Sequence, residues 1–226
     1  MSARNLVAVV AVLLTGLPGL VLAADTAPAQ THTPAAAAQG HTAAPVAAPV
    51  ANTRAALRDL WLGHIFWVRS VVDARLAGDA DRAKVAEQQV VANAKALAGA
   101  IEPYYGKAAA DKLFELLAGH WGAISAYLDA ARGHQDAGKK AALDKLTANA
   151  GQIATFLSSA NSHWPADTLR GLLAAHGAHH VQQIEQLVAH QYAQEAQTWA
   201  AMKDHMYVIA DALADGLAAQ FPEKFR

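Results

Sequence analysis

The chain has 226 residues, of which 54% are hydrophobic and 16% are charged, and its formal net charge is −1. A balance so close to zero supplies no field that would attract nucleic acid or an anionic membrane surface, so neither is expected as a partner. The absence of cysteine excludes disulfides, thiol nucleophiles and attachment through a lipid-modified cysteine.

The first 52 residues differ in composition from the rest of the chain. Residues 1–23 combine Arg4 with an apolar run that ends in Val21-Leu22-Ala23, which predicts a secretory signal peptide cut after Ala23. An uncleaved anchor is the alternative, and the glycines and proline within the short run favour cleavage. Residues 24–52, rich in Ala, Pro and Thr, predict a disordered linker. We therefore expect a periplasmic or secreted protein without stable membrane insertion after cleavage.

The remaining residues show helical periodicity, and no segment of useful length has the period of a strand. Turn residues and prolines divide them into helices at about 53–77, 81–102, 107–132, 138–160, 166–189 and 193–220. Thr53 is the expected N-cap of the first helix.

A repeat of 56 residues organises these helices. The segments LRDLWLGHIFWVRSVVDA at Leu57, LFELLAGHWGAISAYLDA at Leu113 and LRGLLAAHGAHHVQQIEQ at Leu169 align without gaps. The pattern predicts three αα-hairpins, at about 53–105, 106–161 and 162–221, within one all-α domain over 53–226. Such a domain is either a closed six-helix bundle or a short solenoid.

Polar residues recur on the core-facing stripes of the repeats. His64, His120 and His176 share one position in the first helix of each hairpin, and Asn93, Asn149 and His205 share one position in the second. Buried polar groups must be hydrogen-bonded, so one interpretation is a structural layer in which each histidine bonds its hairpin partner and fixes helix register. The protein would then be a structural or interaction module.

The third repeat also supports a metal-binding hypothesis. His176 and His180 are spaced i,i+4 and share a helix face, whereas Val68 and Ile124 occupy the position of His180 in the other repeats. With His120 or His205 as a third ligand, they would form an open three-histidine site for a divalent transition metal such as zinc, nickel or copper.

Catalytic signatures are scarce. The sequence has no Gly-rich phosphate loop and no Gly-x-Ser-x-Gly elbow. A metal-assisted hydrolase or transferase would need an acid or base near the ion, for which Glu185 and Asp204 are the nearby candidates. A binding protein without enzymatic activity is therefore the favoured interpretation.

Two resemblances bear on these expectations. The run HGAHHVQQI from His176 to Ile184 resembles the His-x-x-His-His-Arg-Gly-Gln-Ile signature of the DinB-type helical bundle family, although Val181 and Gln182 replace Arg-Gly. That resemblance implies divalent metal binding through His176 and His180. Over its length, the chain looks similar to a group of uncharacterised exported α-helical proteins of proteobacteria, by the opening at Leu60 to Trp67 and by IADAL at Ile209. Some of those carry names such as glycosyltransferase, which no motif here supports.

Overall fold

The structure is a computed structural model that describes residues 48–226, and all of its long elements are helices. Its helices are α1 (Ala48–Leu76), α2 (Ala80–Gly99), α3 (Glu102–Tyr105), α4 (Lys107–Arg132), α5 (Asp136–Ala160), α6 (Ala166–Val188) and α7 (Tyr192–Gln220), followed by the 3₁₀ helix η1 (Pro222–Phe225). The all-α prediction is confirmed for this part of the chain. The predicted signal peptide and the linker as far as residue 47 lie outside the described residues.

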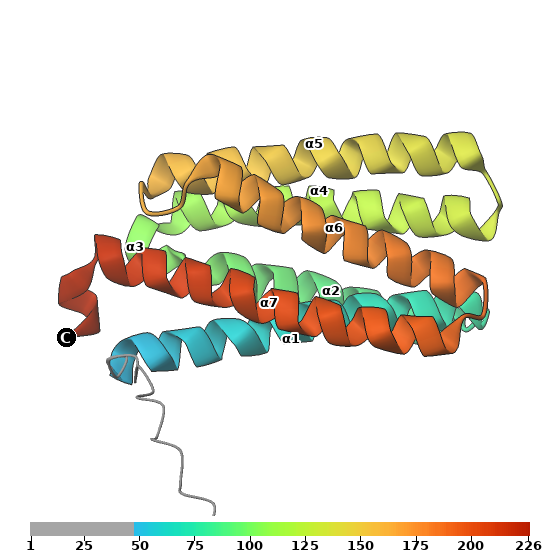
Figure 1. Cartoon of the computed structure of the whole chain (residues 1–226), viewed down its shortest axis with the longest axis horizontal. Helices are drawn as coiled ribbons and strands as arrows, with labels where there is room; N and C mark the ends of the chain where they lie inside the picture. Colours follow the sequence, from blue (N-terminus) through green and yellow to red (C-terminus); the bar gives the residue numbers. More distant parts are fainter. Residues whose placement is uncertain (1–47) are drawn as a thin grey trace, which may run out of the picture. The chain divides into compact units, whose positions relative to one another are not determined.

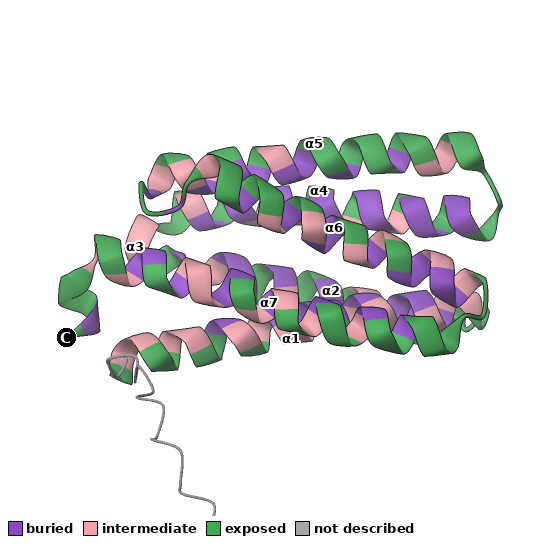
Figure 2. Ribbon diagram, viewed as in Figure 1, coloured by how far each residue is buried: buried purple, intermediate pink, exposed green. Residues whose placement is uncertain are grey.

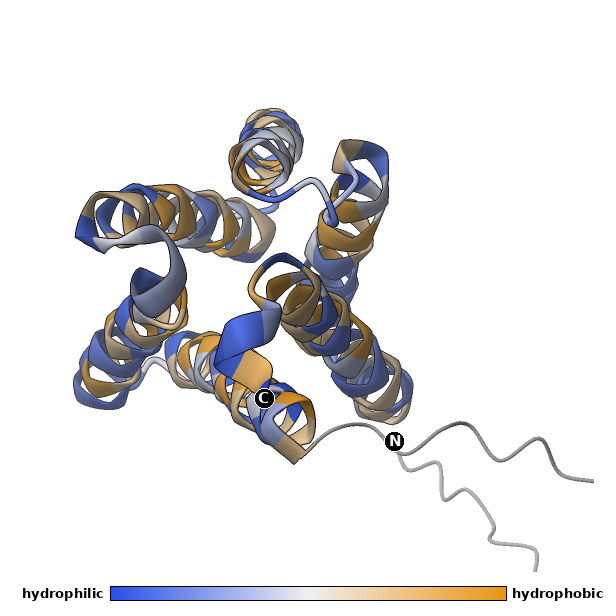
Figure 3. Ribbon diagram, turned by 90° about the vertical axis from the view of Figure 1, so that its left-hand side faces the viewer, coloured by the Kyte–Doolittle hydropathy of each residue, from blue (hydrophilic) through white to orange (hydrophobic). Residues whose placement is uncertain are grey.

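The six long helices close into a ring (Figures 1 and 3). Each packs on the next in the order α1, α2, α4, α5, α6, α7, and α7 packs back on α1. Two ion pairs join the closing helices, Arg54 with Asp215 and Arg58 with Asp211. The domain is therefore a closed bundle rather than an open solenoid.

The first helix starts earlier than its sequence suggests. α1 begins at Ala48, within the stretch assigned to the linker, and Thr53 lies inside the helix instead of capping it. The Thr53 hydroxyl donates to the carbonyl of Pro49, four residues earlier, at 3.0 Å. A second difference is that the expected linker after α2 contains α3, a single turn that starts with Glu102-Pro103.

The connection between α5 and α6 is fixed against α7. The amide of Asn161 donates to the carbonyl of Gly216 at 2.9 Å, and Nε1 of Trp164 donates to the carbonyl of Ala212 at 3.2 Å. A Cβ at Gly216 would lie 1.9 Å from Trp164 Nε1. Only glycine allows this approach, so the contact orients the start of α6.

Buried residues recur along every long helix of the bundle (Figure 2), and the hydrophobic ones form three clusters. One cluster contains Val68, Ile124 and Ile184, a second contains Leu113 and Leu169, and a third contains Trp61 and Met206. On α4 and α6 the stretch between the first two clusters holds histidines at buried positions. A layer of buried histidines thus lies between apolar clusters of the core. No helix in the described part of the chain is long and apolar enough to cross a membrane.

Candidate metal centre

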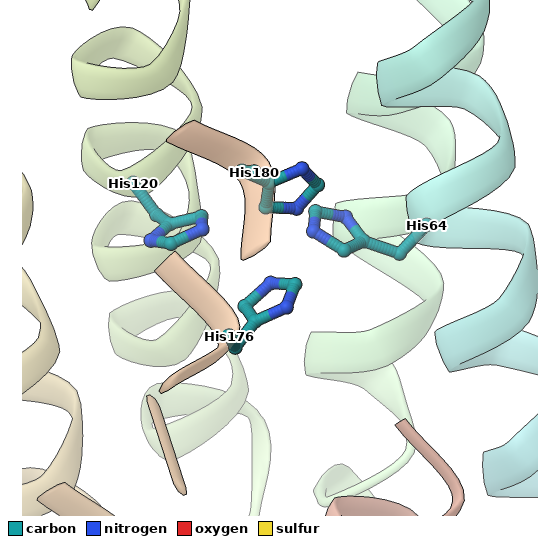
Figure 4. A group of neighbouring side chains, drawn as sticks. All are labelled: His64, His120, His176 and His180. Carbon is teal, nitrogen blue, oxygen red and sulfur yellow. The ribbon is translucent and has the colours of Figure 1, made fainter. Parts of the chain in front are cut away.

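Four histidines meet in this layer (Figure 4). His64 comes from α1, His120 from α4, and His176 and His180 from α6. These three helices alternate around the ring with α2, α5 and α7. The i,i+4 spacing places both imidazoles of α6 on one face, where they meet the rings from α1 and α4.

The four rings converge closely. One nitrogen from each histidine can be chosen so that all four lie within 4.8 Å of one another. The shortest separation of ring centroids is 4.5 Å, between His176 and His180, and His120 stacks on His176 at 5.4 Å. A tetrahedral ion with bonds of about 2.0–2.1 Å would require each nitrogen to move inward by no more than about 1 Å.

These imidazoles are buried and lack hydrogen bonds. His176 and His180 are each 1% exposed, and His64 and His120 are 6% and 5% exposed. Both ring nitrogens of His120, His176 and His180, and Nε2 of His64, have no partner among residues 48–226. Leaving a buried polar group unpaired costs about 1–3 kcal/mol. The layer is therefore costly to the fold, and an ion bound through one nitrogen of each ring would offset part of that cost.

Burial keeps these rings neutral. Desolvation lowers the pKa of His64 to about 3, with a further contribution from His120, and it lowers the pKa of His120 to about 4. Burial, followed by the neighbouring histidines, also holds the pKa values of His176 and His180 well below the ordinary value. Neutral imidazole is the form that binds metal ions, so the nitrogen lone pairs are available at neutral pH.

The hydrogen bonds expected between His64 and Asn93 and between His176 and His205 are not formed. For His120 there is only a contact with Asn149, which raises the pKa of the ring against the larger effect of burial. Instead, the side chains at the partner positions donate to backbone carbonyls of the facing helix. Asn93 donates to Leu60 at 2.9 Å, Asn149 to Leu116 at 3.0 Å, and Nε2 of His205 to Leu172 at 2.8 Å. Each accepting carbonyl belongs to the residue four positions before His64, His120 or His176.

The structure brings three of the four candidate ligands together and separates the fourth. His176, His180 and His120 belong to the cluster. His205 lies beside His179, with ring centroids 5.5 Å apart, and its Nε2 is engaged by Leu172. The fourth member of the cluster, His64, was not among the predicted ligands. The available signal was its position in the predicted repeat, which it shares with His120 and His176.

The candidate acids and bases do not belong to this cluster. Glu185 accepts a hydrogen bond from the hydroxyl of Tyr127 at 2.7 Å and lies 3.5 Å from Lys139. The side chain of Asp204 is 74% exposed and lies next to Lys203. Neither carboxylate is in position to serve as a base at an ion held by the four imidazoles.

An apolar cavity of about 50 Å³ lies next to the layer. Its walls include Trp61, Leu113, Leu117, Leu169 and Leu173. The ring of Trp61 also meets His64 and His176 edge-on, with centroids 5.9 and 5.8 Å apart. Trp61 thus separates the cavity from the histidines, and its fluorescence can report on the site.

Comparison with known proteins gives no relative that names a function. No family model, no curated protein and no solved structure matches this chain.

Proposed function

We propose that this protein binds one transition metal ion, such as zinc, nickel or copper, through His64, His120, His176 and His180. The observation that carries the proposal is that four buried imidazoles from three helices can each bring one nitrogen within 4.8 Å of the others, while seven of their ring nitrogens have no hydrogen-bond partner in the described fold. Folded proteins have a net stability of only about 5–15 kcal/mol, so four unsatisfied imidazoles are a large cost without a ligand.

In this proposal the protein binds the ion without using it for catalysis. Catalytic metal sites keep a coordination position open for water or substrate, whereas four imidazoles fill a tetrahedral ion. The donor group contains no carboxylate. A binding protein therefore fits this site better than a metal-assisted hydrolase or transferase.

The structural-module alternative keeps one specific observation in its favour. Asn93, Asn149 and His205 are hydrogen-bonded to the facing helix of their own hairpin, as a layer that fixes helix register would be. We assign the register role to these three residues and the ligand role to the four unpaired histidines.

Metal analysis tests the proposal directly. The chain is purified without a histidine tag, stripped, offered each metal in turn and assayed for bound metal after desalting. We expect one ion per chain in the native protein and none in a His176→Ala/His180→Ala variant. His163→Ala, which removes an exposed histidine, is the matched control and should retain the ion. Negligible binding in all three proteins would refute the metal site.

We also propose that the protein acts outside the cytoplasm, on the basis of the predicted signal peptide. Mass spectrometry of the mature chain from a Gram-negative host tests this proposal. An N-terminus at Ala24 in the periplasmic fraction supports it, and a full-length chain retained in the cytoplasm contradicts it.

A further inference from the structure

The donor set of the metal centre carries no negative charge. All four candidate ligands are imidazoles, and no carboxylate within residues 48–226 joins the group. A bound ion would therefore keep its whole formal charge inside the bundle. Whether that charge is stabilised depends on the charged and polar groups around the histidine layer.

The surroundings offer little compensation. Glu195 of α7 is a buried carboxylate near one end of α6. Its side chain is 4% exposed. Both of its oxygens accept from the guanidinium of Arg69, at 2.7 and 2.9 Å, and one also accepts from Gln183 at 2.8 Å. Its charge is thus already paired. On α4 and α6 the histidines lie between residues of two apolar clusters, and on α1 His64 lies between Trp61 and Ile65 of a third.

The cost of burying an ion in such a medium rises with the square of its charge. A divalent ion therefore meets a desolvation penalty about four times that of a monovalent ion of the same size. Most divalent sites reduce this cost with thiolate, carboxylate or hydroxide ligands. Here the four rings and the closed bundle leave no such anion beside the ion.

We infer that the four-histidine centre selects a monovalent soft metal ion, copper(I), over zinc(II), nickel(II) and copper(II). Imidazole nitrogen suits zinc, nickel and copper alike, so the preference rests on the charge of the ion and not on the type of donor, and copper(II) in addition favours tetragonal arrangements. This inference rests on the proposed metal-binding function and adds the charge and identity of the ion.

Competition titrations test the choice of ion. Metal-free full-length protein is titrated under anaerobic, reducing conditions with chelator-buffered copper(I), and separately with chelator-buffered zinc(II), nickel(II) and copper(II). Bound metal per chain is the readout. We expect one copper(I) per chain, bound at least about tenfold more tightly than any of the divalent ions. Equal or tighter binding of a divalent ion would overturn the inference and leave the metal site standing. If no ion binds, both proposals fail.

A pair of variants isolates charge from ligand loss. His64→Asn removes one imidazole without adding charge, whereas His64→Asp removes the same imidazole and adds a carboxylate. We expect the ratio of copper(I) to zinc(II) affinity to be at least about tenfold lower in His64→Asp than in His64→Asn. The same ratio in both variants would show that charge does not set the selectivity.

The pair His180→Asn and His180→Asp repeats this measurement at a second ligand. It decides the question if circular dichroism shows that either His64 variant has not folded. The same comparison of ratios applies, and equal ratios again overturn the inference.

Discussion

Two sets of polar residues occupy this bundle, and their hydrogen bonds differ. Asn93, Asn149 and His205 each donate to a backbone carbonyl of the facing helix. The clustered histidines, which come from α1, α4 and α6, have unpaired ring nitrogens. Burial alone therefore does not distinguish a structural polar residue from a candidate ligand. The amides of Asn93 and Asn149 each donate one hydrogen bond to the backbone and keep an unpaired oxygen, whereas both ring nitrogens of His120, His176 and His180 are unpaired.

Acidification should have the largest effect, because it lowers the stability of the fold through the clustered histidines and not through Asn93 and Asn149. The pKa values of the clustered histidines are lowered, to about 3 for His64 and about 4 for His120, so the unfolded chain takes up protons that the folded chain does not. Stability is therefore full above about pH 6.5 and falls as the pH drops towards 4, by about 1.4 kcal/mol per pH unit for each histidine that stays neutral.

Chemical denaturation of metal-free protein between pH 6.5 and pH 5 measures this dependence. That window lies above the ordinary pKa values of most carboxylates. The slope should decrease by one proton in His120→Leu and stay the same in Asn149→Ala. An unchanged slope in His120→Leu would contradict neutral burial of this ring.

Loading with metal is expected to have the next largest effect. An ion that binds only the folded chain stabilises it by about 4 kcal/mol when its free concentration is a thousand times Kd. Thermal unfolding with and without the ion should show this gain in the native protein and in Asn149→Ala. A gain of the same size in His176→Ala/His180→Ala would mean that the ion binds elsewhere.

Substitutions in metal-free protein should act with opposite signs in the two sets. His120→Leu removes two unpaired ring nitrogens and should stabilise the fold by about 1–3 kcal/mol, because an apolar side chain has no such deficit. Asn149→Ala removes a formed hydrogen bond and should destabilise it by about 0.5–1.5 kcal/mol. Urea unfolding measures the change in stability of each variant. Destabilisation of similar size in His120→Leu and Asn149→Ala would contradict the difference proposed between the two sets.

The smallest expected effect concerns the glycines beside the amides. A Cβ at Gly119 would lie 3.2 Å from Asn149 Nδ2, whereas a Cβ at Gly122 meets nothing within 4 Å. Both Gly→Ala changes gain about 1 kcal/mol of helix propensity, but Gly119→Ala also crowds the hydrogen-bonded amide. The Gly122→Ala variant should therefore be more stable by several tenths of a kcal/mol to about 1 kcal/mol, measured by urea unfolding.

The helical content was predictable because apolar periodicity and proline positions determine it locally. The start of α1 was not, because Thr53 uses its hydroxyl within the helix, bonding back to Pro49. Closure of the bundle was also not predictable from the sequence pattern. It depends on long-range contacts between α1 and α7, such as the ion pair of Arg58 with Asp211.

The site was partly predictable for the same reason. The spacing of His176 and His180 gives their common face directly. The sequence pattern pairs His64 with Asn93 because it relates residues within one hairpin, whereas the ring brings α1, α4 and α6 together across hairpins. Only the structure shows how closely Asn93 approaches α1 at Gly63. A Cβ added at Gly63 would lie 3.1 Å from Nδ2 of Asn93.

The cavity beside Trp61 has a consequence for how quickly the site can be filled or emptied. The histidine layer is sealed from solvent, so the passage of an ion must wait for side chains to move aside. The cavity of about 50 Å³ lies against Trp61, and we expect this ring to shift towards it when an ion enters or leaves. We expect the residence time of the ion to be set by this gate as much as by its bonds to nitrogen. A larger side chain at Leu117 would then lengthen that time while leaving the affinity unchanged.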